Sequence, residues 1–160
     1  MALPVEVRNP IRVIGKTVRT PLQTIPGIPG GLLYTTGDAF GAKFEIEVPR
    51  SGILHTAVFI DKDDEGIETD LVLFVQDFLE TTDNSEFTVV DADFHSFLST
   101  ITFSTFKNFA LNQVSSAAAI GLAYNAPLGK LFAQCVTRGG PTIAAGSSPM
   151  IALTILSDEP

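Results

Sequence analysis

Few residues of this chain are of types that perform chemistry, and their surroundings argue against catalysis. The sequence holds one cysteine, Cys135, and two histidines, His55 and His95. A nucleophile is activated by a histidine that a carboxylate orients, and neither histidine lies in a recognised context such as a Gly-x-Ser-x-Gly turn. Cys135 lies in an apolar stretch, which is typical of a small core residue. We therefore expect no catalytic residue and no enzymatic activity.

An acidic stretch at residues 61–66, Asp-Lys-Asp-Asp-Glu-Gly, is the strongest candidate for a cation site. Acids at the first and third positions and glycine at the sixth resemble the start of a calcium-binding loop. The fifth position is Glu65, however, and the twelfth position, which needs a bidentate glutamate, is Val72. The signature fails, so we expect a solvated connection between strands and no dedicated metal site, with weak calcium binding by Asp61–Glu65 as the alternative.

Two further patterns are too weak to predict a ligand. Asp91 and Asp93 form a carboxylate pair of the kind used in glycoside hydrolysis, but a sugar site also needs stacking groups. The chain has no Trp and two Tyr. The glycine-rich residues 27–31 lack the lysine and the spacing of a phosphate-binding loop. No cofactor is expected.

Composition bounds the class of protein. The chain has 160 residues and 17.1 kDa, which fits one domain. A net charge of −8 argues against nucleic-acid binding, and no apolar run approaches the ~18 residues of a membrane span. One cysteine excludes an intramolecular disulfide, and the first residues lack the pattern of a signal peptide, so we expect synthesis in a reducing cytoplasm. A mean hydropathy of +0.29 predicts burial in a core or in contacts between chains.

The charge is unevenly distributed along the chain. The first twenty residues carry four basic residues, Arg8, Arg12, Lys16 and Arg19, against Glu6, while residues 21–160 carry 6 basic and 17 acidic groups. Residues 21–31 hold three prolines and three glycines, which predict a connector or an arm that lies on a neighbour. We predict a basic N-terminal strand and Pro/Gly-rich arm over residues 1–31 and a β-sandwich domain over residues 32–160.

Short β-strands dominate the predicted domain. Residues 43–48 alternate between charged and apolar side chains, and residues 71–75 are apolar throughout, which predicts burial on both faces. Residues 107–114 give no clear pattern. Asp91 is expected to cap a short helix over residues 91–98, with Phe94, Phe97 and Leu98 on one face. Predicted strands are residues 11–18, 43–48, 53–61, 67–76, 99–104, 131–138 and 150–156. About eight short strands and one helix indicate an all-β fold, an antiparallel, jelly-roll-like β-sandwich.

An ordered set of motifs resembles one family. The motifs are Tyr34-Thr-Thr-Gly-Asp38, Leu71-Val-Leu-Phe-Val-Gln-Asp77, Thr82-Asp-Asn-Ser-Glu-Phe87, Asp91-Ala-Asp93, Leu131-Phe-Ala-Gln-Cys-Val-Thr-Arg138 and a final Ile-Leu-Ser-Asp158. In this order, behind a basic N-terminal strand, they are similar to bacteriophage head decoration (cement) proteins. Each motif alone is unspecific.

The resemblance implies a jelly-roll-like trimer that is made in the host bacterial cytoplasm and binds the major capsid protein outside the shell of the virion. It carries over no catalytic residue. We expect Arg8, Arg12, Lys16 and Arg19 to contact an acidic capsid surface. Two alternatives stay open: another virion component of similar fold, such as a head-fibre base, vertex or tail-associated module, and a carbohydrate-binding jelly roll.

Overall fold

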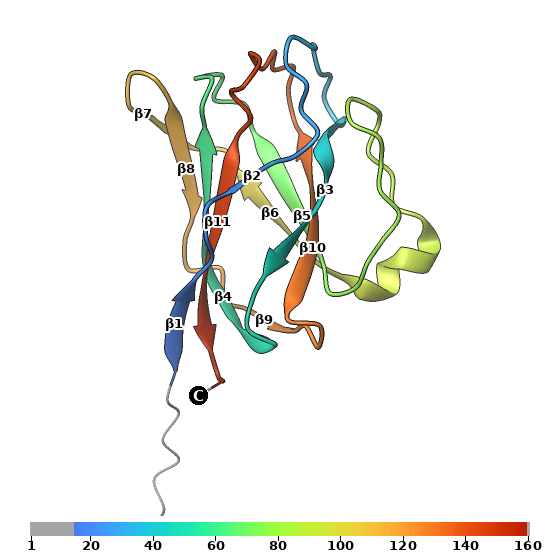
Figure 1. Cartoon of the computed structure of the whole chain (residues 1–160), viewed down its shortest axis with the longest axis vertical. Helices are drawn as coiled ribbons and strands as arrows, with labels where there is room; N and C mark the ends of the chain where they lie inside the picture. Colours follow the sequence, from blue (N-terminus) through green and yellow to red (C-terminus); the bar gives the residue numbers. More distant parts are fainter. Residues whose placement is uncertain (1–14, 160) are drawn as a thin grey trace, which may run out of the picture.

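Two antiparallel β-sheets pack face to face in the computed structural model, which describes residues 15–159 (Figure 1). The strands are β1 (Lys16–Arg19), β2 (Gln23–Thr24), β3 (Ala39–Glu47), β4 (Ser51–Asp61), β5 (Thr69–Phe74), β6 (Phe97–Phe103), β7 (Phe106–Asn108), β8 (Gln113–Ala117), β9 (Leu122–Asn125), β10 (Lys130–Thr137) and β11 (Met150–Ser157). A short 3-10 helix, η1 (Asp91–Ser96), precedes β6. The all-β sandwich predicted from the sequence is confirmed.

The order of the strands is that of a jelly roll. One sheet runs β1-β11-β4-β8-β7, with β2 also on β11 and β9 also on β4. The other runs β3-β10-β5-β6. The chain crosses between the sheets at β2–β3, β3–β4, β4–β5, β6–β7, β9–β10 and β10–β11, while β5 and β6 are neighbours in one sheet, which is the jelly-roll pattern. The first and last strands of the described chain lie side by side, and Lys16 is paired with Ser157.

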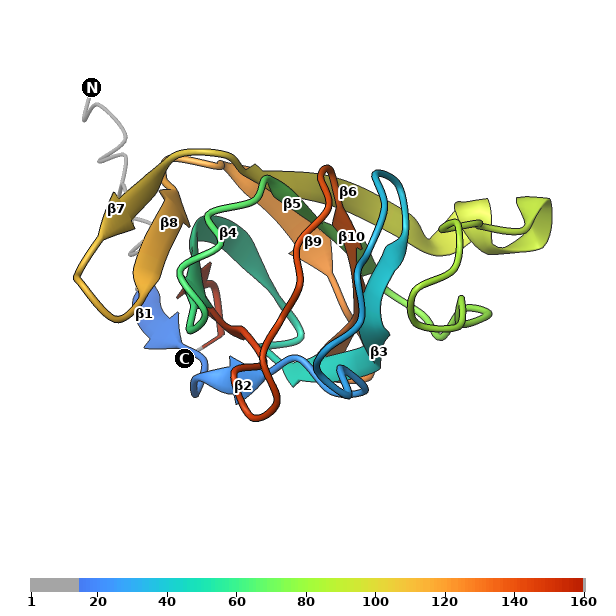
Figure 2. The same cartoon turned by 90° about the horizontal axis from the view of Figure 1, so that it is seen from above.

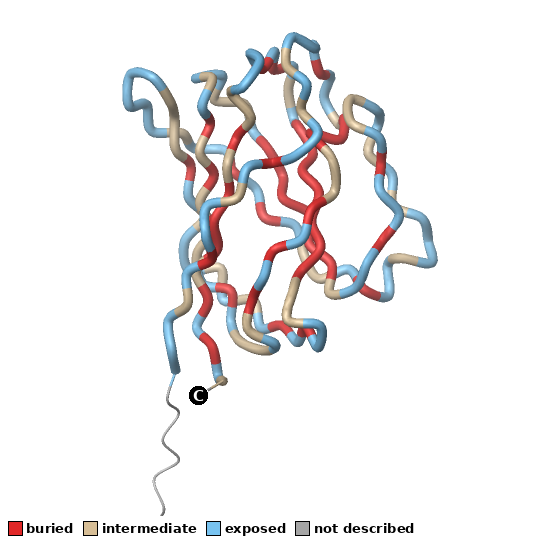
Figure 3. The backbone as a smooth tube through the Cα atoms, in the orientation of Figure 1, coloured by how far each residue is buried: buried red, intermediate tan, exposed pale blue. Residues whose placement is uncertain are grey.

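The core lies between the sheets, where buried side chains follow the strands (Figure 3). In β3, Phe44 and Ile46 are buried while Glu45 and Glu47 are exposed, as the alternation in the sequence predicts. β5 is buried at every position, so the predicted burial on both faces is confirmed. Leu71 and Leu73 face the core between the sheets, and Val72 and Phe74 belong to a second cluster.

That second cluster forms because the chain covers the outer face of its own four-stranded sheet. Residues 75–96 leave β5, pass outside this sheet and return to β6 (Figure 2). Phe78 is buried and stacks on Phe74 at a ring-centroid distance of 4.1 Å. We name residues 75–96 the covering segment.

The predicted helix over residues 91–98 is corrected in three respects. It is a 3-10 helix that ends at Ser96, and β6 begins at Phe97. Val90 is its N-cap and no side chain caps it, so Asp91 does not. Phe97 and Leu98 are consecutive residues at the start of β6, and consecutive side chains of a strand point to opposite faces. Leu98 packs on the core, whereas Phe97 and Phe94 are largely exposed.

Other boundaries differ modestly from the predicted ones. Residues 107–114, which gave no clear pattern, contribute to the β7–β8 hairpin, and β9 was not predicted. The domain boundary at residue 31 stays a prediction, although β1 and β2, which precede it, pair with β11. Among residues 15–159, no helix is long and apolar enough to cross a bilayer.

Candidate interaction surfaces

The cysteine and the two histidines lie apart from one another and do not form a catalytic site. Cys135 is fully buried in β10, and burial raises the pKa of its thiol. Exposed His55 occupies a bulge of β4, where the register with β11 skips one residue. Its carbonyl accepts the N–H of Ile120 at 3.0 Å. His95 is exposed in η1, with Nε2 3.2 Å from Oε1 of Gln76. These three groups lie in separate elements, and neither histidine contacts Cys135.

The acidic loop after β4 uses its carboxylates to hold its own backbone. Asp61 is buried and accepts the N–H groups of Asp63 at 3.0 Å and Gly66 at 2.7 Å. Asp63 in turn accepts the N–H of Ala144 at 2.6 Å. Within residues 15–159, no group of three His, Cys, Asp or Glu side chains is placed to hold a metal ion.

In the carboxylate pair of η1, the Asp93 side chain also binds a backbone N–H group. Asp93 accepts the N–H of Leu79 at 2.8 Å and so ties η1 to the start of the covering segment. Asp91 is exposed. The pair therefore does not form the two-sided carboxylate arrangement of a glycosidase.

A buried polar cluster that we did not predict fastens the covering segment to the sheet. Gln134 is fully buried, accepts the N–H of Thr81 at 3.1 Å and donates to the carbonyls of Thr81 and Gly41 at 2.6 and 3.0 Å. Asp83 accepts the hydroxyl of Tyr34 at 2.9 Å and the N–H of Gly41 at 2.7 Å. The only feature of the sequence that could have indicated this cluster is a glutamine within an otherwise apolar strand.

The outer face of the seven-stranded sheet carries no charge over its central strands. Its residues alternate with core residues such as Ala57, Phe59 and Leu153, and none of them joins the core cluster. We name them the uncharged face: Ile53, Thr56, Val58, Ile60, Val114, Ser116, Met150, Ala152, Thr154 and Leu156. They form rows across the strands, such as Val114–Ile60–Met150 and Ser116–Val58–Ala152.

This composition is unusual for an exposed sheet face, which ordinarily alternates with polar and charged residues. The four-stranded sheet also has an apolar outer face, but there the covering segment buries it. In the part of the chain that the structure describes, no segment covers the uncharged face in the same way. Ile53 and Leu156 are 42% and 38% exposed, Ser116 is exposed, small Ala152 is buried between its neighbours, and the other members are half-buried. The face therefore offers apolar area for contact with another protein.

Of the four predicted contact residues, Arg19 lies beside this face and Lys16 lies on the same edge strand. Lys16 and Arg19 are exposed on β1, the edge strand next to β11. Arg19 is paired with Thr154, a residue of the uncharged face. Arg8 and Arg12 lie outside the described residues. Both residues lie on the edge strand, but Lys16 is paired with buried Ser157, so the two side chains point to opposite faces of the sheet. No contact with a capsid is tested.

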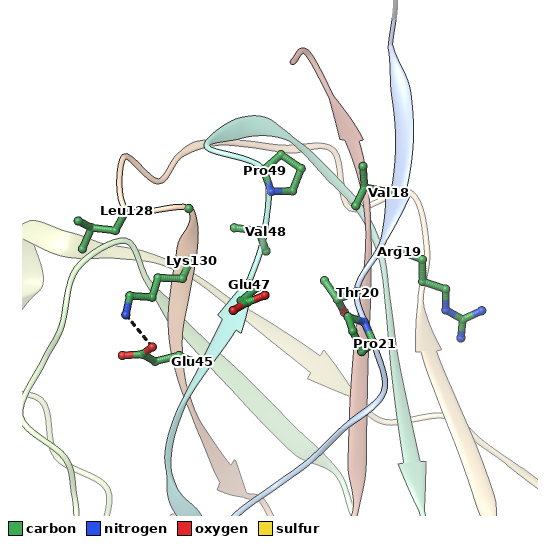
Figure 4. A pocket seen from close by; sticks show the side chains of 11 residues that line it. Val18, Arg19, Thr20, Pro21, Glu45, Glu47, Val48, Pro49, Leu128 and Lys130 are labelled. Atoms are coloured by element: carbon green, nitrogen blue, oxygen red, sulfur yellow. Dashed lines mark hydrogen bonds and ion pairs between the residues drawn. The ribbon is translucent and has the colours of Figure 1, made fainter. Parts of the chain in front are cut away.

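A groove opens at the side of the sandwich between the edges of the two sheets (Figure 4). Its volume is about 500 Å³. Residues 18–21 form one wall and the end of β3 with Val48 and Pro49 forms the other, while Leu128 and Lys130 line it from beyond β3 (Figure 4). Lys130 pairs with Glu45 at 2.7 Å. A second hollow, lined by residues 20–24 and 45–47, continues the groove along β3.

Comparison with known proteins adds no assignment, since no family model, curated protein or solved structure matches this chain.

Proposed function

We propose that this chain is a non-enzymatic structural protein of a bacteriophage particle. It binds the major capsid protein on the outside of the shell as a trimer and stabilises the shell. The observation that carries this proposal is the uncharged face beside the basic edge of β1. A protein that holds a shell together works through contact area and through several simultaneous attachments, and needs no reactive group. The ordered motifs that resemble decoration proteins supply the class of particle.

In this proposal the uncharged face joins copies of the chain. Each copy carries a net charge of −8, so contact through acidic surfaces is repulsive, whereas an uncharged face lets copies approach. Strands of this length and spacing give a face about 30 Å by about 20 Å, or roughly 600 Å². That is close to the ~800 Å² that each partner buries in a standard interface. Light scattering at micromolar concentration should show a species of three times 17.1 kDa, and a monomer would exclude a preformed trimer.

The basic edge is assigned to the shell. Replacing Lys16 and Arg19 together by glutamate is expected to weaken binding at least tenfold at low salt, because attraction to an acidic surface becomes repulsion. The measurement is the number of copies that sediment with purified shells of the phage across a salt series. Lys62→Glu with Lys107→Glu is the matched control, because both residues are exposed and lie away from β1. Equal occupancy for both double variants would contradict the assignment.

A further inference from the structure

The groove lies between two strand edges that have no partner strand among the described residues. β3 is the end strand of the four-stranded sheet, and β1 is an end strand of the seven-stranded sheet. Edge strands present unpaired N–H and C=O groups, which are a template for an added strand. At the opposite side of the sandwich the chain passes directly from β6 to β7. Unpaired strand edges of both sheets therefore face each other only on the side of the sandwich where β1 and β3 lie, among the described residues.

Peptide groups of β3 point into this groove. The N–H of Val48 donates to the carbonyl of Gly129, on the side of β10. Peptide groups alternate in direction along a strand, so those of Glu45 and Glu47 face the groove. An extended segment placed there would gain backbone hydrogen bonds, which supply affinity in strand addition.

From these observations we propose that the groove receives residues 5–14 of a second copy of this chain as a strand added to β3. The odd positions of that segment are mostly apolar, namely Val5, Val7, Ile11 and Val13, and the even positions include Arg8 and Arg12. Such an alternation suits a strand with one buried side. The apolar side matches Val18 and Val48 of the groove, and the arginines match Glu47, because Glu45 is already paired with Lys130.

A second copy fits the groove better than the chain's own N-terminal segment. Lys16 is already paired with Ser157, so a tight return would need its turn at Ile14 and Gly15. The two-residue hairpin turns require a positive φ at the first of these positions. A β-branched residue such as Ile14 rarely adopts a positive φ. In a second copy, residues 5–14 span up to about 33 Å when extended, enough to follow the groove without a turn. This assignment deepens the proposed self-association, since it names a segment that links the copies.

Disulfide cross-linking between two full-length variants tests the exchange. One preparation carries Glu47→Cys and the other carries Arg12→Cys, and a parallel series uses Arg8→Cys to allow for the register. Native Cys135 is fully buried and does not compete. Mild oxidation of an equal mixture should give a linked two-chain product at least fivefold above the control. The control mixes Arg12→Cys with Lys107→Cys, which places an exposed thiol on the β7–β8 hairpin.

Two results would overturn the proposal. The first is a yield no higher than the control for both arginine positions. The second is a chain carrying Arg12→Cys and Glu47→Cys together that links only within itself, because its own segment then fills the groove. The experiment contains no shell, so it separates the two proposals. A cross-link without shell binding would refute the capsid function alone, and shell binding without a cross-link would refute the exchange alone.

Discussion

Gln134 is a polar side chain in the middle of a buried strand, and its amide joins two layers of the molecule. Its three hydrogen bonds reach the backbone of Thr81 in the covering segment and of Gly41 in β3. Among the described residues, every buried polar side-chain atom has a partner. The satisfied amide therefore fixes where the covering segment lies, while the apolar contacts around it supply most of the attraction.

Replacing Gln134 by leucine is expected to destabilise the protein by about 2–3 kcal/mol, because the N–H and C=O of Thr81 lose their partner in a buried place. Urea unfolding followed by circular dichroism measures the loss. Gln76→Leu, at an exposed position, is the control and should change stability by less than about 0.5 kcal/mol. Equal urea midpoints of unfolding for the two variants would contradict this and show that water replaces the hydrogen bonds of the Gln134 amide.

Both tyrosines are expected to resist ionisation while the protein is folded. Burial raises the pKa of Tyr34 and of Tyr124 well above the ordinary 10.0, and Asp83 raises that of Tyr34 further. A raised folded-state pKa contributes stability below pH 10 that is lost as the pH rises above it, because the unfolded chain then releases these protons. In an alkaline titration, phenolate absorbance should appear only together with unfolding. The chain has no other tyrosine and no tryptophan, so the signal is specific. Phenolate formation near pH 10 in folded protein would contradict the burial of both rings.

At the residue scale, the sequence predicts the burial of a side chain where its immediate neighbours in the sequence decide it. The burial of Cys135 and of Leu71 followed from apolar neighbours. The role of Gln134 could not be predicted, because its partners are 53 and 93 residues away in the sequence. A polar residue in an apolar strand indicates that a partner exists but does not say which one.

The covering segment is the element that makes a four-stranded sheet with two apolar faces possible. Phe78 and Phe87 pack on Val72 and Phe74, so a long connection takes the place of a third layer. Outside the cluster, Lys43 donates to the carbonyl of Phe78 at 2.8 Å and pairs with Asp77. The hydrogen bond from the Lys43 ammonium group lowers the pKa of the Asp77 carboxyl.

Truncation of Phe78 to alanine should therefore release the segment. We expect a loss of about 3 kcal/mol, as for other buried aromatic side chains, and faster amide exchange in residues 76–90 than in β10. Hydrogen–deuterium exchange with peptide resolution measures both regions. Phe94→Ala is the control, since that ring is 54% exposed. Uniformly faster exchange in both regions would indicate that the segment and the sandwich unfold as one unit.

Secondary-structure elements were predicted correctly where the sequence pattern is long, and the prediction was wrong where the pattern is short. Residues 43–48, which form most of β3, and the apolar β5 carry clear strand patterns, whereas Ala39–Ala42 at the start of β3 do not alternate. Around residues 91–98, three apolar residues fit a helical face, yet the last two are strand residues that point to opposite sides. Pairing of β6 with β5, which places Phe97 opposite Phe74, decided the outcome.

For the whole molecule, the distribution of charge is the property that matters for assembly. A single charge on the uncharged face should weaken self-association. Val58→Glu places a carboxylate between Ser116 and Ala152, where contact would remove its water. We expect at least a tenfold rise in the dissociation constant, measured by sedimentation equilibrium. Thr100→Glu, at an exposed position of β6, adds the same charge elsewhere. An equal effect of both substitutions would indicate general repulsion rather than contact through this face.

The uncharged face was not predicted, and the reason is topological. Its residues come from β4, β8 and β11, which only the jelly-roll order brings together. One local signal existed, because residues 57–60 of β4 are apolar at both alternating sets of positions. Such a run indicates a strand that is covered on both sides, but the sequence cannot say whether the second cover is the same chain or another one.

The pairing of Lys16 with Ser157 gives the molecule two unlike poles. The first and last described strands end together at one pole, while the loops that precede β3, follow β4 and precede β11 lie at the other (Figure 1). A guest peptide joined directly at Gly15 and one joined directly at Glu159 would therefore emerge from the same pole. A guest inserted at residues 144–148 would be presented at the opposite one, so the choice of site sets the direction of display.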